Sequence, residues 1–166
     1  ISYRLVGSEM CIRDRGMLIK KAMKGQLDLI GPATAVGEEL LGIPDFAIPD
    51  FSEPLSQEKH VLKNLKKVFL MIAGAGVQKY GTELEEHQQL LLAVADILIE
   101  IYMAESALLR AEKNVGIYGF EAQEHQVALS QLYLYQATEK ITTKGREAIL
   151  GFAESDEQKA LLMGLK

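Results

Sequence analysis

The sequence contains little cysteine, proline or tryptophan: one cysteine, four prolines and no tryptophan among 166 residues. The cysteine, Cys11, lies in an N-terminal run without any periodicity, so we expect none in the folded part of the chain. Without cysteine there is no disulfide, no thiolate nucleophile and no zinc–cysteine site. Disulfide scaffolds, cysteine enzymes and zinc-finger modules are therefore excluded for the part of the chain after this run.

The chain also lacks an excess of positive charge and a long apolar run. Its 18 basic and 23 acidic residues give a formal net charge of −5. Nucleic-acid binding requires a basic footprint, so we expect no nucleic-acid partner. No apolar run is long enough to cross a bilayer, and no secretory signal is visible. These absences predict a soluble cytoplasmic protein.

Glycine and proline are both absent over 32 residues, from Thr82 to Lys113. Thr82 followed by Glu85 has the spacing of a capping box and predicts that a helix starts there. Apolar residues recur at helical spacing and predict one buried stripe: Leu84, Leu91, Val94, Leu98, Ile101 and Leu108. Four further positions widen this stripe on one side: Leu90, Ile97, Ala104 and Ala111. A stripe of this width predicts a helix buried against more than one neighbour.

The remaining patterns are helical too, and no strand pattern competes with them. Ser56 is a good N-cap for a helix that continues to about Tyr80 and stops at Gly81. A linker at Asn114–Phe120 precedes a further helix from Glu121 to about Phe152, whose buried line is Val127, Leu134, Ile141 and Ala148. Ser155 with Gln158 predicts the start of a last, short helix. We therefore predict an all-α fold, an antiparallel up-down bundle of three long helices with short flanking helices.

Residues 1–55 are predicted to lie outside this bundle. Residues 5–15 read LVGSEMCIRDR, which looks like a translated sequencing-library adapter joined in frame, so we treat 1–15 as non-native and expect the native start to be missing. Three of the 18 basic and two of the 23 acidic residues lie there, so the remainder carries 15 and 21 and a net charge of −6. Residues 16–55 are predicted to hold short helices, one opening at Pro32, and a proline-rich strap. The bundle itself is predicted to span 56–166.

Polar residues of the predicted helices offer few candidates for a site. His87 and His125 lack the Glu-x-x-His spacing of a carboxylate-bridged di-iron bundle, and both lie near helix starts. We interpret them as solvated end residues. Asp96 and Glu100, one turn apart, are predicted to meet lysine or arginine on a neighbouring helix, since a catalytic pair has no acid–base partner fixed nearby. The sequence thus predicts no catalytic, cofactor-binding or metal-binding residue.

Small residues in the helix after Ser56 resemble part of a nucleotide-binding loop. In Ala73-Gly74-Ala75-Gly76, however, the third glycine of a GxGxxG motif would fall at Lys79, and no strand precedes it. We interpret this run as a place where two helices approach closely, with Gly145 as the facing notch.

The same helix carries a basic face, made of Lys59, His60, Lys63, Lys66 and Lys67 beside apolar residues. A basic amphipathic face is typical of a membrane surface or a partner site. It is also typical of an ordinary solvated face, which is the interpretation the sequence favours. Weak peripheral membrane contact stays open as the alternative.

Three stretches together resemble the C-terminal helical extension of acyl-CoA dehydrogenases of the very-long-chain-like branch. The stretches are GMLIKKAMKG at residues 16–25, EEHQQLLLAVADILIEIYMAESALLRAEK at 85–113 and EAQEHQVALSQLYLYQATEKI at 121–141. The first resembles the stretch after the flavin domain of bacterial members, and the other two resemble the long extension helix and the helix that follows it. The resemblance covers 16–166 and is silent on substrate.

The resemblance implies a part of an oxidoreductase without its active site. In that family a glutamate in a Glu-Gly-Thr turn removes the α-proton of the acyl thioester while FAD takes a hydride from the β-carbon. That turn would precede residue 16, where the adapter-like run stands. Tyr80-Gly81-Thr82 lacks the glutamate, so no catalytic role is transferred to it.

Two hypotheses follow. One is a non-catalytic C-terminal module of a FAD-dependent acyl-CoA dehydrogenase of fatty-acid β-oxidation, inactive alone, which binds no cofactor itself. It would support packing onto the missing N-terminal catalytic domains, homo-oligomerisation or peripheral membrane contact. The other is a free-standing helical interaction protein that only shares the bundle pattern.

Overall fold

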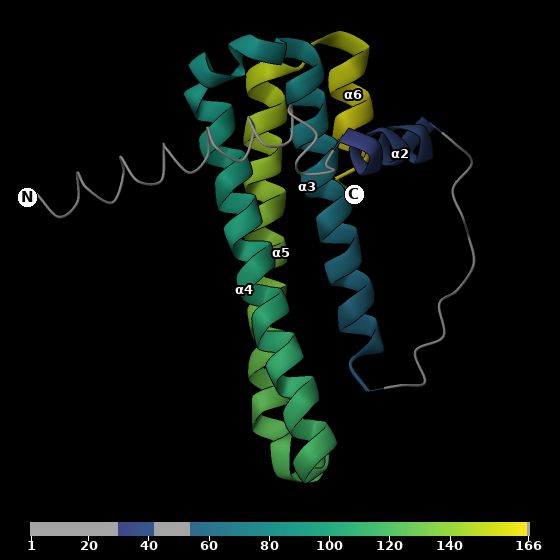
Figure 1. The fold of residues 1–166 in the computed structure, drawn as a ribbon, viewed down its shortest axis with the longest axis vertical. Helices are drawn as coiled ribbons and strands as arrows, with labels where there is room; N and C mark the ends of the chain where they lie inside the picture. The colour runs from purple at the N-terminus through teal and green to yellow at the C-terminus, as the bar shows by residue number, and fades with distance from the viewer. Residues whose placement is uncertain (1–29, 42–53, 166) are drawn as a thin grey trace, which may run out of the picture.

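The computed structural model describes residues 30–41 and 54–165 (Figure 1). Every regular element in these two ranges is helical, which confirms the all-α prediction. The elements in chain order are α2 (Ile30–Leu41), α3 (Ser56–Tyr80), the 3₁₀ turn η1 (Gly81–Glu86), α4 (Gln88–Tyr118), the 3₁₀ turn η2 (Glu121–Gln123), α5 (Glu124–Phe152) and α6 (Ser155–Met163). The predictions for 1–29 and 42–53, including the adapter-like run and the proline-rich strap, lie outside the described residues.

Three long helices form the predicted antiparallel up-down bundle. In Figure 1, α4 and α5 run side by side along the whole molecule, and α3 lies against both of them. The hairpin of α4 and α5 extends beyond the start of α3, while α2 crosses α3 near its other end and packs on it. Amide contacts help to set the hairpin register: Asn114 Nδ2 donates to Gln126 Oε1 at 2.7 Å.

The core confirms the stripe predicted for α5 and shifts the one predicted for α4. All four predicted α5 residues are buried: Val127, Leu134, Ile141 and Ala148. In α4 the buried line is instead Leu90, Ala93, Ile97, Ile101, Ala104, Leu108 and Ala111. The positions predicted to widen the stripe are therefore its centre, and Leu91, Val94 and Leu98 are only partly buried at its edge. The shift arises because α4 faces both α3 and α5, whose directions the sequence of α4 does not specify.

Several predicted helix ends are wrong, because backbone geometry rather than a capping side chain sets them. Thr82 lies inside η1, and α4 begins only at Gln88, so the predicted capping box does not start this helix. Ser56 is already the first residue of α3, and the N-cap of this helix is Leu55 at φ 62°. The buried Ser56 Oγ has no hydrogen-bond partner among the described residues. The predicted linker from Asn114 is also wrong, since α4 continues to Tyr118 despite Gly116.

At the last helix, Ser155 is the first residue of α6 rather than its N-cap, which is Glu154. Gln158 Nε2 donates to the carbonyl of Ala153 at 2.9 Å, so the predicted capping box is replaced by a different side-chain contact. The other predicted end is confirmed: Gly81 ends α3 at φ 51°, a conformation that glycine adopts at little cost.

Gly145 is the predicted notch in α5, although its partners differ from those predicted. A Cβ atom at this position would lie 3.0 Å from both Ile72 Cδ1 and Leu165 Cδ2. Gly74 instead faces Ala33 of α2, and Gly76 faces Leu90 of α4. The small residues of α3 thus permit close helix approach, as predicted, but to two different helices.

Candidate functional site

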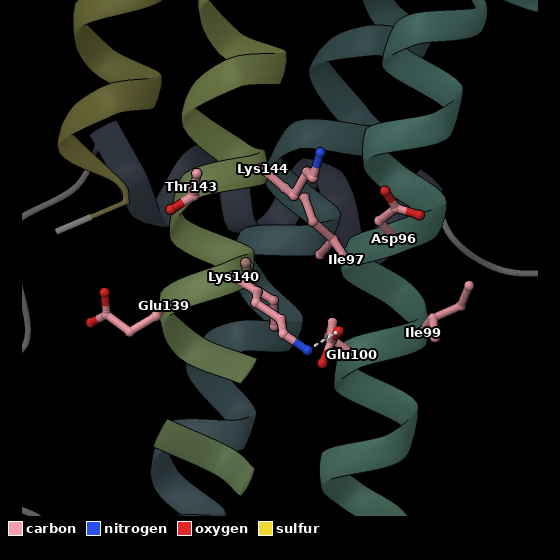
Figure 2. Close-up of a pocket in the computed structure, with 9 residues that line it drawn as sticks. Asp96, Ile97, Ile99, Glu100, Glu139, Lys140, Thr143 and Lys144 are labelled. Carbon is pink, nitrogen blue, oxygen red and sulfur yellow. Dashed lines mark hydrogen bonds and ion pairs between the residues drawn. The ribbon is translucent and has the colours of Figure 1, made fainter. Parts of the chain in front are cut away.

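The α4–α5 hairpin contains a shallow groove of about 390 Å³. Asp96, Ile97, Ile99 and Glu100 line it from α4, and five residues line it from α5: Glu139, Lys140, Ile141, Thr143 and Lys144 (Figure 2). These residues come together because one-turn spacing on each helix places them on facing sides of an antiparallel pair.

Glu100 is the centre of the polar contacts in this groove. Its Oε1 accepts from Lys140 Nζ at 2.8 Å, and its Oε2 accepts from the Tyr133 hydroxyl at 3.0 Å. Figure 2 shows the Lys140 ammonium reaching across the groove to this carboxylate. The prediction that Glu100 meets a cation on a neighbouring helix is confirmed. For Asp96, which lines the same groove, the structure shows no ion pair with another described residue.

The pKa values of both partners of Glu100 are raised. Burial raises the pKa of Tyr133 above its ordinary value, and the hydrogen bond and negative charge of Glu100 raise it further. The hydrogen bond to Glu100 and its charge also raise the pKa of Lys140. Neither side chain is therefore adjusted to exchange protons near neutral pH, where general acid–base catalysis requires it. The arrangement fixes the register of α4 against α5 rather than performing proton transfer.

The histidines occupy the helix starts where the sequence placed them. His87 precedes α4 and stacks on Tyr80, with ring centroids 3.4 Å apart. Both rings line a second hollow of about 680 Å³ at the end of the bundle, together with Lys144 and Phe152. His125 is exposed in the first turn of α5. Within residues 30–41 and 54–165, no three His, Cys, Asp or Glu side chains are grouped to hold a metal ion.

The basic face of α3 is largely occupied by ion pairs within the molecule. Lys59 pairs with Glu112 and Lys66 with Glu105, both on α4, and Lys67 pairs with Glu39 on α2. Three of its four lysines therefore already have carboxylate partners on neighbouring helices. None of the described helices has the length and apolarity that a membrane span requires.

The sequence interpretation missed a second apolar face on α4. Large side chains are exposed on the side of α4 away from its buried line: Leu92, Ile99, Tyr102, Met103 and Leu109. The signal was present as a second 3–4 spacing within the run without glycine or proline. It was absorbed into a single wide stripe, because apolar content alone does not separate two faces of a helix.

Three comparisons with known proteins all match the chain to acyl-CoA dehydrogenases. A family model described as "Acyl-CoA dehydrogenase, C-terminal domain" matches residues 64–166. The chain is 34% identical over 152 residues to a probable acyl-CoA dehydrogenase of Bacillus subtilis (strain 168), covering 89% of this chain and 25% of that protein.

The fold is similar to part of a solved structure, the acyl-CoA dehydrogenase of Bacillus anthracis complexed with FAD. The TM-score is 0.83 at 33% identity, and the match covers 93% of this chain and 25% of that one. The chain thus spans about a quarter of the length of the relatives it matches. Two proteins that share only a helical-bundle pattern would be similar in fold but not in sequence, whereas this chain is similar to its relatives in both.

Proposed function

We propose that this chain is a non-catalytic packing module of a FAD-dependent enzyme. The premise is that the chain belongs to the acyl-CoA dehydrogenase family, as its C-terminal helical domain. In this role the bundle supports the assembly of an oxidoreductase whose flavin and acyl-CoA sites lie in the other three quarters of the protein. FAD and the acyl-CoA substrate are thus proposed for the whole enzyme and not for this domain.

The observation that carries the proposal is the state of Glu100. This carboxylate lines the α4–α5 groove, and its two oxygens accept from Lys140 and Tyr133. A carboxylate that abstracts a proton must reach the substrate with a free oxygen. The groove is accordingly a structural contact between two helices, which is what a packing module requires.

Membrane contact through the basic face of α3 is the weaker of the roles considered. Each lysine near an anionic surface contributes about 1 kcal/mol of attraction, but Lys59, Lys66 and Lys67 are already paired with carboxylates. Packing within an enzyme, by contrast, uses the apolar face that α4 leaves uncovered.

The test is to assay the purified 166-residue chain for flavin and for activity. We expect no flavin absorbance band after incubation with FAD and no dye reduction with acyl-CoA esters of short, medium or long chain. A full-length acyl-CoA dehydrogenase serves as the positive control. Stoichiometric FAD, or dye reduction that depends on acyl-CoA, contradicts the proposal.

A further inference from the structure

The helix α2 is held to the bundle mainly through a single neighbour. It packs on α3, whereas α3, α4 and α5 each pack on several other elements. In Figure 1, α2 crosses α3 rather than running along it. A helix that crosses another touches it over a short stretch, so the contact area of α2 is small compared with that of the three long helices.

The described side chains of α2 contribute little to the core. Within residues 31–39, only Ala33 and Val36 are half-buried, and the other residues are exposed. No residue of this range belongs to the buried core, although Val36 packs against its edge. The space beside Gly37 is open, since a Cβ there would meet nothing within 4 Å. Burial, which stabilises the long helices, therefore stabilises this part of α2 only weakly.

Ala33 and Glu39 provide contacts that hold α2 on α3. A Cβ on Gly74 would stand 2.9 Å from the Cβ of Ala33, so the glycine allows the two helices to approach closely. Glu39 pairs with Lys67, and its side chain remains 59% exposed in this pair. An ion pair as exposed as this one contributes little to stability and is screened by salt.

The helix α2 is also weak in itself. It has 12 residues, which is marginal for an isolated helix in water, and it contains Gly31 and Gly37. We therefore expect α2 to stay helical only while it is docked on α3. Elements with few buried contacts open at a lower free energy than the core of the same protein.

We propose that α2 is a detachable helix, which leaves α3 while α3, α4 and α5 stay folded. The inference deepens the packing role in the proposed function and rests on it, because the family match places the rest of the enzyme on the N-terminal side of this domain. Since α2 precedes the bundle in the chain, the connection to the rest of the enzyme opens at α2 without breaking the core.

The first experiment measures hydrogen exchange of the 166-residue chain by mass spectrometry. We expect the amides of α2 to exchange at least about a hundredfold faster, relative to their intrinsic rates, than those in the middle of α4 and α5. They should still exchange more slowly than an unstructured peptide, because the docked state predominates. Protection of α2 equal to that of α4, or no protection at all, would overturn the proposal.

The second experiment releases α2 by filling its contact with α3. Gly74→Val sets a branched side chain against Ala33, whose Cβ is fixed to the backbone and cannot turn away. We expect exchange in α2 to become roughly tenfold faster or more, which corresponds to the cost of overpacking, while α4 and α5 keep their protection.

Gly116→Val in α4 is the matched control, since the same substitution there meets nothing within 4 Å. It should leave exchange in α2 unchanged. If Gly74→Val lowers the protection of α2, α4 and α5 by the same factor, α2 belongs to the cooperative unit of the bundle and the proposal is wrong. Neither experiment bears on the proposed function, which is tested separately by flavin binding and dye reduction.

Discussion

The two sides of α4 have nearly the same composition and opposite environments. Ile97 is fully buried, whereas Ile99, two residues later, is 53% exposed. Leu108 and Leu109 differ in the same way although they are adjacent. The comparison teaches that the apolar residues of a long helix need not all pack into one core. The inner side of α4 stabilises the bundle, whereas the outer side is exposed and can contact another surface.

The largest expected effect comes from truncating the inner side. Ile97→Ala should lower the free energy of unfolding by roughly 2–5 kcal/mol, because Ile97 is fully buried and the change leaves a cavity in the core. Ile99→Ala, the same change at a site that is 53% exposed, should cost less than about 1 kcal/mol. Urea unfolding at low protein concentration measures both, and equal losses would erase the distinction between the two sides.

Filling a notch should have a smaller effect. In Gly145→Val the new Cβ atom would lie 3.0 Å from Ile72 Cδ1 and from Leu165 Cδ2, which is closer than normal van der Waals contact. Overpacking of this kind costs about 1–3 kcal/mol. Gly116→Ala near the end of α4 is the matched control, since a Cβ there meets nothing within 4 Å. That change should stabilise by about 0.4–1 kcal/mol, so thermal midpoints that fall for both variants would contradict the assignment.

The contribution of the Glu100 contact between α4 and α5 to stability should be lost at high pH. A phenol whose pKa is raised by folding contributes stability that is complete below its unfolded pKa, about 10, and is lost as pH rises through the folded value. Lys140, whose pKa is raised as well, acts in the same direction. Stability should therefore fall above about pH 10, and less steeply in Tyr133→Phe; parallel profiles would show that the hydroxyl does not titrate in this contact.

The smallest effect is expected at the basic face of α3. The parent chain and a variant with Lys59, Lys63, Lys66 and Lys67 changed to glutamine should co-sediment equally with anionic vesicles, because three of these lysines already pair with carboxylates. The measurement is made at low and high salt, since screening weakens surface attraction. Partitioning of the parent that exceeds the variant at low salt alone would restore the membrane role.

Much of the bundle could be predicted from the sequence, because it follows from local rules. Helical periodicity predicted three long helices, and in α5 it located the buried line at Val127, Leu134, Ile141 and Ala148. The end of α3 at Gly81 followed from the freedom of glycine at positive φ. The resemblance to acyl-CoA dehydrogenases also came from residues alone, and the comparisons agree with it.

Tertiary structure decided what the local rules leave open. Three predicted side-chain caps failed, at Ser56, Thr82 and Ser155, since the N-cap residues of α3, α4 and α6 make no side-chain capping hydrogen bond. Which side of α4 is buried depended on the directions of α3 and α5, and only then did Leu92 and Ile99 stand out as uncovered. Glu100 likewise found Tyr133 and Lys140 only once the hairpin register brought residues 33 and 40 positions apart together. Periodicity fixes a helix and its apolar content, whereas the partners of each side are a property of the assembled bundle.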